Sequence, residues 1–341
     1  MLQLTPDAPS AIPLLPEKNS DITREAEQVV DLNGPLNIPA NAMTVMRVKT
    51  GVYTVNVSIN TLKKADRLVV TFQGARGGGK DTPNSRRPMF GRRNWENLFG
   101  CPILAISDPQ TEMEWGSHLP RVGMYAGSFK DDLVPELNAM IDKFCTELGI
   151  PLNRVVMYGS SSGGTSAMLV GARRKHPTGV IAVVPFLRPE KFREEVVAIT
   201  SKAAGGDLDD WNNALTNTPW RYNPLIAVKD SITDGNDLRV VVAQNIKDKV
   251  TINRHFAGLW RRFDIDPQGG YSPDGRVAAV LFDSADAGHG HEPPEFSMPL
   301  IKMAYKFFDT PAAQIADSMP KKAKKSKEMI DQEEAMADTD E

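Results

Sequence analysis

Cysteine is scarce in this sequence, and long apolar runs are missing. Only Cys101 and Cys145 occur among 341 residues, and neither a Cys-x-x-Cys pair nor another metal-ligand spacing of cysteine and histidine is present. Two thiols in a chain of this length do not make a disulfide framework, so neither a disulfide-rich fold nor a metal site is expected. No run of about 18 uncharged apolar residues exists, so no membrane-spanning helix is expected.

An excess of positive charge is also missing. The 40 basic residues are balanced by 43 acidic ones, which gives a net charge of −3. A protein so close to neutrality is not expected to be a general nucleic-acid binder. The first residues carry no basic segment followed by an apolar run, so no signal peptide is predicted, and a cytoplasmic location is the default expectation.

Short, almost continuous apolar runs alternate with helical patterns over residues 66–310. Such runs are typical of strands buried on both faces of a parallel sheet. They occupy residues 67–73, 102–107, 154–158, 180–185, 238–243 and 277–282. Helical patterns fall between them, at residues 132–148, 166–175 and 252–263. The alternation predicts an α/β fold with a doubly wound, mostly parallel sheet.

The rest of the chain differs in character. Residues 1–65 predict an N-terminal arm and a β-rich segment, because polar and apolar residues alternate over 43–60. Residues 186–237 form a predicted insertion between the fourth and fifth apolar runs, where a lid would determine substrate selectivity. Residues 311–341 form a predicted disordered tail with a basic block before an acidic one. If a protein partner exists, this tail is the expected contact.

The strongest motif is Gly159-x-Ser161-x-Gly163, which follows a predicted buried strand and opens a helix. Such a turn holds the serine in a strained conformation, and small residues on either side let the strand and helix pack closely. The serine would lie at a helix N-terminus, where backbone N–H groups stabilise an oxyanion. Ser161 is therefore the candidate nucleophile. The alternative is a Gly/Ser-rich turn that only connects the two elements.

With this motif, residues 66–308 resemble the α/β-hydrolase superfamily. The other matching features are a strand and loop at Phe72-Gln73-Gly74 and a late Gly288-His289 pair. Segments 106–109 and 123–127 are also similar to bacterial hydrolase-like proteins of surface-glycan biosynthesis and accessory secretion. The resemblance implies that the domain at 66–310 carries its nucleophile, acid and histidine in this chain order.

That order points to His289 as the general base. His289 follows the predicted strand 277–282 and lies between Gly288 and Gly290. These glycines would let the loop bend toward the turn at residues 159–163, which we call the elbow. His291 is the alternative, and a site without a catalytic histidine is another. The remaining histidines are expected to be surface or satisfied polar residues: His118, His176 and His255.

The resemblance places the orienting acid after the preceding strand, at Asp248. This residue would fix the tautomer of the histidine and stabilise its cation during the reaction. An aspartate before a helix is also a good N-cap, so a purely structural role is the alternative. Asp283 and Asp286 are further candidates, although they lie close to His289 in the sequence.

The oxyanion hole is expected to combine the backbone N–H of Ser162 with that of Gly74 or Ala75. The glycine-rich loop that follows lacks the Gly-Lys-Ser/Thr of a phosphate-binding loop, so phosphate binding is the weaker interpretation. Residues 76–93 hold six basic residues against one acidic residue. They predict either a solvated loop or an electropositive rim for an anionic substrate.

Arg76 and Trp95 are the candidates for substrate contact in this region, and core packing is the alternative for Trp95. The sequence as a whole predicts a serine esterase with a small-molecule or glycan ester as substrate, an acyl-enzyme intermediate, and no metal or organic cofactor. Two alternatives stay open. One is an acyltransferase that passes an acetyl group to a glycan with the same triad, and the other is a non-catalytic scaffold with this fold.

Overall fold

The computed structural model describes residues 2–5, 28–75, 88–112, 122–192, 194–284, 289 and 294–319. These ranges contain all six apolar runs and the three helical patterns. Outside them lie Arg76, His118, Asp286, His291, residues 6–27 of the predicted arm, and the predicted tail from residue 320 onward.

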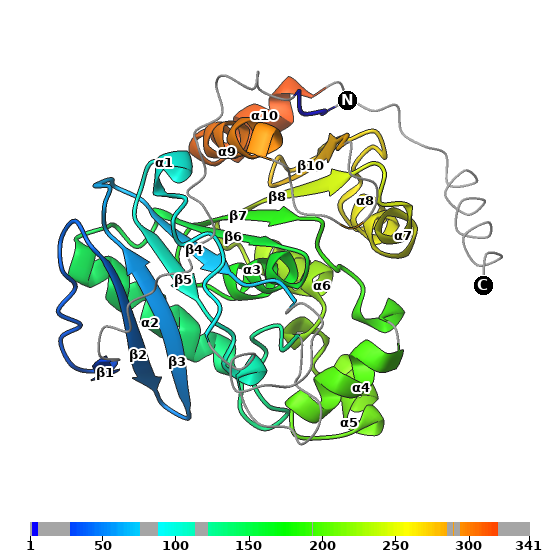
Figure 1. Cartoon of the computed structure of the whole chain (residues 1–341). Helices are drawn as coiled ribbons and strands as arrows, with labels where there is room; N and C mark the ends of the chain where they lie inside the picture. The colour runs from blue at the N-terminus through cyan, green and yellow to red at the C-terminus, as the bar shows by residue number, and fades with distance from the viewer. Residues whose placement is uncertain are drawn as a thin grey trace, which may run out of the picture.

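One ten-stranded sheet runs through the described residues, in the order β1-β2-β3-β5-β4-β6-β7-β8-β10-β9 (Figure 1). Its strands are β1 (Gln28–Asp31), β2 (Met43–Thr50), β3 (Tyr53–Asn60), β4 (Leu68–Phe72), β5 (Ile103–Ile106), β6 (Val155–Ser160), β7 (Thr178–Val183), β8 (Leu238–Asn245), β9 (Gly270–Tyr271) and β10 (Val277–Phe282). The six strands from β5 to β10 in this order are parallel. The prediction of a mostly parallel, doubly wound sheet is confirmed.

The sheet reverses its direction of winding at β4. The chain passes from β4 to β5 on one side and then crosses to β6 on the other side. In open α/β sheets, a ligand crevice lies outside the carboxyl ends of the strands at such a switch point. The loops after β4 and β6 therefore meet where a binding site is expected.

Helices cover both faces of the sheet, because each buried strand presents alternate side chains to either face (Figure 1). Val155 and Met157 of β6 lie in one apolar cluster, whereas Val156 and Tyr158 lie in the other. The first cluster packs under α2 (Leu133–Leu148), α3 (Ser162–Ala172), α6 (Pro224–Thr233) and α8 (Ala257–Phe263). The second packs under α1 (Glu96–Phe99), α9 (Pro294–Asp309) and α10 (Ala312–Ser318).

Strands β2 and β3 form an antiparallel hairpin that extends the sheet, as the alternation over 43–60 predicts. Thr50 pairs with Tyr53, so only two residues connect the strands. Gly51 adopts a φ of 25°, and a Cβ there would lie 2.7 Å from a carboxylate oxygen of Glu136. Glu136 of α2 accepts hydrogen bonds from the Thr50 hydroxyl (2.5 Å) and the Val52 N–H (3.1 Å), which docks the hairpin on the helix.

The predicted insertion, residues 186–237, contains α4 (Glu194–Ala203), α5 (Leu208–Asn217) and α6, with short turns η4 (Pro189–Lys191) and η5 (Pro219–Arg221). Figure 1 shows α4 and α5 side by side beyond the end of the sheet, whereas α6 belongs to the core layer. Trp211 of α5 packs with Met124 and Ala126, which precede α2. The buried Arg221 donates hydrogen bonds to the backbone carbonyls of Ala126, Ser128 and Phe129. We call α4, α5 and η5 the cap.

Three helix boundaries differ from the sequence-based expectation. Helix α3 begins at Ser162 rather than 166, because the elbow leads directly into it. The pattern at 252–263 divides into a π-helix, η6 (Ile252–Phe256), and α8, preceded by α7 (Lys249–Thr251). The tail was predicted to begin at 311, but α10 occupies 312–318. Its Ile315 is buried against the second apolar cluster, and this burial stabilises the extra helix.

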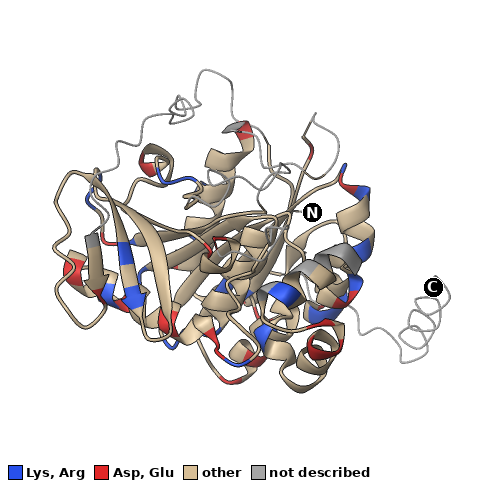
Figure 2. Cartoon of the chain, turned by 60° about the horizontal axis from the view of Figure 1, so that its bottom comes forward, with Lys and Arg blue, Asp and Glu red and all other residues tan. Residues whose placement is uncertain are grey.

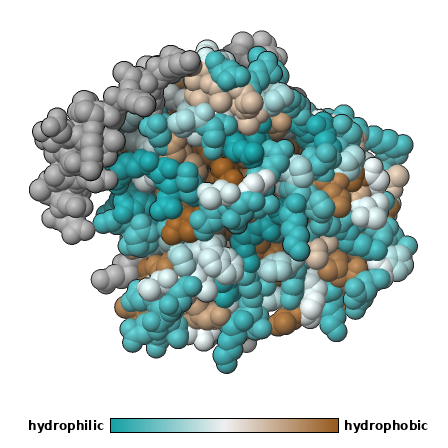
Figure 3. Space-filling view, turned by 180° about the vertical axis from the view of Figure 1, so that it is seen from behind, coloured by the Kyte–Doolittle hydropathy of each residue, from teal (hydrophilic) through white to brown (hydrophobic). Residues whose placement is uncertain are grey.

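The surface of the described residues mixes both charge signs. Figure 2 shows that the positions of basic and acidic residues alternate along the ribbon of the helices. On the face seen in Figure 3, apolar residues lie in separate groups among hydrophilic ones. A search of the described residues for a helix of the length and apolarity needed to cross a membrane gave none.

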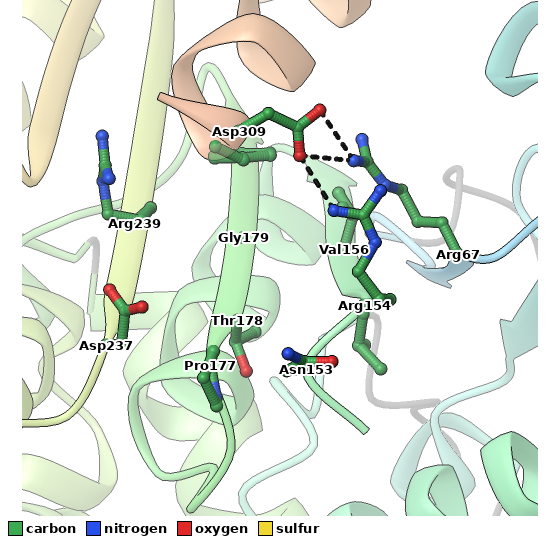
Figure 4. A pocket seen from close by; sticks show the side chains of 12 residues that line it. Arg67, Asn153, Arg154, Val156, Pro177, Thr178, Gly179, Asp237, Arg239 and Asp309 are labelled. Carbon is green, nitrogen blue, oxygen red and sulfur yellow. Dashed lines mark hydrogen bonds and ion pairs between the residues drawn. The ribbon is translucent and has the colours of Figure 1, made fainter. Parts of the chain in front are cut away.

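A pocket of about 400 Å³ lies at the amino ends of β6, β7 and β8, on the edge of the sheet opposite the elbow (Figure 4). Asp309, the last residue of α9, accepts hydrogen bonds there from Arg67 (2.8 and 3.0 Å) and Arg154 (3.0 Å). The Arg67 side chain is 9% exposed and also lies over the Tyr305 ring. These ion pairs connect the end of α9 to the residues that precede β4 and β6.

Replacing Asp309 by asparagine is expected to lower the free energy of unfolding by about 1 to 2 kcal/mol. The reason is that a largely buried guanidinium loses its charged acceptor, a contact stronger than a neutral hydrogen bond. Urea denaturation measures the change. Asp66→Asn serves as control, because Asp66 pairs with Arg154 from a 72% exposed position. It should cost less than about 0.5 kcal/mol, and equal losses in both variants would contradict the interpretation.

Candidate active site

Ser161 lies at the sharp turn between β6 and α3. Its φ of 55° and ψ of −129° place a non-glycine residue in a sparsely populated region, a conformation that costs on the order of 1 to 3 kcal/mol. Hydrogen bonds hold the turn: the Ser161 N–H donates to the Val183 carbonyl (2.8 Å), and the Ser161 carbonyl accepts from the Gly164 N–H (2.9 Å). The side chain is thereby aimed outward from the end of the strand.

Three glycines make this turn sterically feasible. A Cβ on Gly159 would lie 2.1 Å from the Gly163 carbonyl oxygen, and one on Gly163 would lie 2.6 Å from the Phe72 carbonyl oxygen. A Cβ on Gly164 would lie 3.0 Å from the Gly159 carbonyl oxygen. The contacts at Gly159 and Gly163 are too short for a larger residue, and the one at Gly164 is tight. The strand, the helix and the end of β4 therefore approach one another closely because Gly159 and Gly163 lack side chains.

His289 and Asp248 complete a hydrogen-bonded line that starts at the serine. The Ser161 Oγ lies 2.7 Å from Nε2 of His289, and Nδ1 of His289 lies 2.8 Å from Oδ2 of Asp248. Asp248 follows β8 and is 3% exposed at its side chain, whereas the His289 side chain is 32% exposed. The structure therefore brings together the three residues that sequence reasoning selected for catalysis.

Asp248 is held in its ionised form. Burial acts to raise the pKa of this carboxyl, but hydrogen bonds from the Thr251 side chain and N–H and from His289 outweigh burial, so the pKa lies below its usual value. The Thr251 N–H, 3.1 Å from Oδ1, also makes Asp248 the N-cap of α7. The two interpretations weighed for this residue, acid and N-cap, are thus compatible.

Two residues in contact with His289, Thr251 and Phe186, are not predicted from the sequence. The Thr251 hydroxyl lies 3.3 Å from Nδ1. The Phe186 ring stacks on the imidazole, with centroids 4.9 Å apart and planes 17° apart. Nothing in the local pattern marks either residue, because both contacts join segments distant in the sequence.

The loop after β4 lies against the elbow, as the oxyanion-hole prediction requires. A Cβ on Gly74 would lie 3.3 Å from the Ser160 carbonyl oxygen. Gln73 is fixed by its N–H, which donates to the Tyr125 hydroxyl (2.9 Å), while that hydroxyl donates to the Ile106 carbonyl (2.6 Å). Ala75 is the next residue after Gly74, and Ser162 is the first residue of α3. The candidate backbone N–H donors of the oxyanion hole therefore come from two adjoining segments.

Of the two residues expected to contact substrate, Arg76 lies outside the described residues. Trp95 is half-buried in an aromatic group with Phe99 and Tyr158, at 6.1 and 6.2 Å between centroids. The Arg92 guanidinium lies over the Trp95 ring and donates to the Ser160 hydroxyl (2.5 Å). The contacts of Trp95 are those of core packing, the alternative weighed for it.

His255 is a buried neutral histidine beside the site. Its side chain packs edge-on against Phe186 and Phe192, and its Nδ1 accepts the Arg188 N–H (3.2 Å). Burial lowers its pKa to about 4. It is thus a satisfied polar residue, as expected for it. His176 lies half-exposed, 3.6 Å from Asp142.

The part of the chain that the structure describes contains no group of side chains that could serve as ligands for a metal ion. A search of these residues for three or more His, Cys, Asp or Glu side chains grouped closely enough to hold an ion gave none.

The fold can be compared with proteins of known structure. The chain superposes on the capsule O-acetyltransferase of Neisseria meningitidis serogroup A with a TM-score of 0.52 and 14% identity, over 81% of this chain and 98% of that one. A fluorophosphonate-binding serine hydrolase of Staphylococcus aureus gives a TM-score of 0.51 at 8% identity, over 79% and 99%. The acylaminoacyl peptidase of Pyrococcus horikoshii gives 0.51 at 11%, over 83% of this chain and 43% of the peptidase.

By sequence, no family model and no curated protein matches the chain. The structural similarities, at such low identity, concern the fold, and the chain has the α/β-hydrolase fold.

The burial of neutral His255 predicts a pH dependence of stability. Between its unfolded pKa near 6.5 and its folded pKa of about 4, the unfolded chain binds a proton that the folded chain does not. The free energy of unfolding should therefore fall as the pH drops through this window, by about 2 kcal/mol near pH 5. Urea denaturation above pH 6.5 and near pH 5, on the wild type and on His255→Gln, isolates the contribution of His255 to the pH dependence. An unchanged pH dependence in the variant would refute the assignment.

Proposed function

We propose that this protein is a serine hydrolase that cleaves a carboxylic ester through Ser161, His289 and Asp248. The observation that carries the proposal is the hydrogen-bonded line from Ser161 Oγ through both imidazole nitrogens to Asp248, at distances of 2.7 and 2.8 Å. A serine hydroxyl is a weak nucleophile unless a neutral base can take its proton at this range. The strained elbow supplies the second requirement, a serine hydroxyl placed at a helix N-terminus.

In the acylation step, Ser161 Oγ attacks the carbonyl carbon of the ester while Nε2 of His289 accepts the hydroxyl proton. Asp248 keeps the other proton on Nδ1, so that Nε2 is free to act as a base, and its negative charge stabilises the imidazolium that forms. The imidazolium then gives its proton to the departing alcohol. Water, activated by the same Nε2, hydrolyses the acyl-enzyme and restores the serine.

The negative charge on the tetrahedral oxygen would be stabilised by backbone N–H groups. We assign one to Ser162, the first residue of α3, and the other to Gly74 or Ala75. The close approach of Gly74 to the Ser160 carbonyl and of Gly163 to Phe72 supports this assignment, because it brings the two segments to the same side of the nucleophile. One such donor contributes on the order of a hundredfold to a thousandfold in rate.

Acyl transfer to a sugar hydroxyl is the second candidate. The similarity in fold to a capsule O-acetyltransferase, which extends over 98% of that chain, favours it. The same residues would form the acyl-enzyme, and only the acceptor would differ. Product analysis of an acetyl ester, with and without a glycan acceptor, separates the candidates: acetylated glycan supports transfer, and free acetate alone supports hydrolysis.

A fluorophosphonate probe should label the wild-type protein, and Ser161→Ala should abolish the labelling, because the probe bonds covalently to an activated serine oxygen. Intact-protein mass spectrometry measures the adduct. Ser166→Ala is the matched control, since its hydroxyl lies one turn further along α3 and donates to the Ser162 carbonyl. Labelling that survives in Ser161→Ala, or a folded wild type that is not labelled, would exclude the proposal. The latter result would favour a non-catalytic scaffold.

Asp248→Asn should lower kcat/KM for an ester substrate by roughly a hundredfold to ten-thousandfold, because an amide no longer fixes the His289 tautomer or stabilises its cation. Since the pKa of Asp248 lies below its usual value, its carboxylate should remain ionised at pH values where an ordinary aspartate already takes up a proton. Loss of activity at higher pH would then have another origin.

Asp283→Asn is the control, because Asp283 is one of the two alternative acids, with Asp286, and pairs instead with Lys247 at the surface, 2.8 Å away. Its kcat/KM should stay within about threefold of wild type. If Asp283→Asn inactivates the protein and Asp248→Asn does not, the acid has been misassigned.

A further inference from the structure

We propose that Phe186 positions the catalytic histidine, its ring acting as a flat support that sets the tilt of the His289 ring. This inference rests on the function proposed above. Phe186 follows β7 and begins the insertion, far in the sequence from His289. The two rings nonetheless lie nearly parallel, 17° apart, with centroids separated by 4.9 Å. This is the offset stacking that aromatic pairs favour.

The hydrogen bonds of His289 alone do not fix its tilt. Ser161 and Asp248 bind the two ring nitrogens from nearly opposite edges, 2.7 and 2.8 Å away. Such a pair of bonds only weakly restrains rotation of the ring about the line that joins its nitrogens, so some freedom to tilt remains. The two nitrogens occupy the 1 and 3 positions of the five-membered ring, so the Nδ1–H and the Nε2 lone pair point at an angle to the line between them. Rotation of the ring about this line therefore misaligns both hydrogen bonds. A ring stacked on one face removes this freedom.

Phe186 is itself tied to the helix that carries the nucleophile. Its N–H donates to the Thr165 hydroxyl (3.0 Å), and that hydroxyl donates back to the Phe186 carbonyl (2.8 Å). Thr165 is fully buried in α3, one turn after Ser161. Helix α3 therefore holds both Ser161 and the Phe186 ring that supports His289. Few bonds separate the two residues, so the distance between them is well defined.

Two further rings pack edge-on against the Phe186 ring. Phe192 meets it edge-on at 5.9 Å, and His255 does so at 5.4 Å. Phe192 also stacks with Trp211 of α5, 6.4 Å away. It packs there against a cluster that we call the cap cluster, formed by Met124, Ala126, Val197, Trp211 and Tyr222. An aromatic series thus leads from the cap to the histidine, and the insertion contributes to the geometry of the reacting groups.

Stacking also favours the state that the reaction needs. The imidazole is neutral before attack and positive after it takes the serine proton. The face of an aromatic ring attracts a cation, so Phe186 interacts more strongly with His289 after proton transfer than before. An interaction that strengthens along the reaction path accelerates the chemical step rather than substrate binding.

Two substitutions separate a support role from simple packing. Phe186→Met keeps similar volume without a flat ring, and Phe186→Tyr keeps the ring. Hydrolysis of p-nitrophenyl acetate should show kcat reduced roughly tenfold to a hundredfold in the methionine variant, with KM changed less than about threefold. The tyrosine variant should stay within about threefold of wild type in both. Fluorophosphonate labelling rates should follow the same order.

Phe129→Met is the matched control, because this half-buried ring packs against Tyr222 in the cap cluster, 6.1 Å away. It should retain wild-type kcat. A folded Phe186→Met with wild-type kcat, or a loss that appears in KM or equally in the tyrosine variant, would overturn the inference. If Phe186→Met does not fold, Phe186→Leu takes its place, and equal kcat in the leucine and tyrosine variants overturns the inference. A wild type inert to both reagents would instead refute the proposed function.

Discussion

The contact between β6, α3 and the end of β4 is the constraint on which the rest of the site depends. Without side chains at Gly159 and Gly163, backbone atoms of three segments come together where the sheet reverses its winding. The turn that results gives Ser161 a positive φ and points its side chain outward from the edge of the sheet. The same contact brings the loop after β4 beside the nucleophile, so one packing requirement governs both the serine and the candidate oxyanion donors.

This constraint extends to the next strand. The Ser161 N–H bonds to the Val183 carbonyl at the end of β7, and the following residue, Val184, turns the chain with a φ of 42°. Thr165 of α3 then clasps both backbone groups of Phe186. The insertion thus leaves the sheet in a direction set by the elbow helix. A mutation that loosened α3 would displace the nucleophile and the ring beside the histidine together.

Much of this arrangement follows from the sequence, and the missing parts have a common cause. The apolar runs predict the central strands because strands buried on both faces carry little else, and the glycine pair around Ser161 marks a turn that few other residues tolerate. Chain order within the resembled superfamily led to Asp248 and His289. Phe186 and Thr251 could not be found in this way, because stacking and the second contact to Nδ1 depend on how distant loops meet. The α10 helix was missed because it buries one side chain, Ile315, which gives too weak a periodicity.

Two histidines lie beside the same phenyl ring, and their surroundings suit them to different tasks. His255 is 4% exposed and its Nδ1 accepts a backbone N–H, so burial disfavours a positive charge there more than the nearby Glu190 favours one. His289 keeps a third of its side chain open to solvent and lies against the buried, ionised Asp248. When His289 takes the proton of Ser161, its positive charge therefore lies next to the Asp248 carboxylate and against the face of the Phe186 ring. The histidine that lies in line with the serine is thus the one that has a carboxylate beside it.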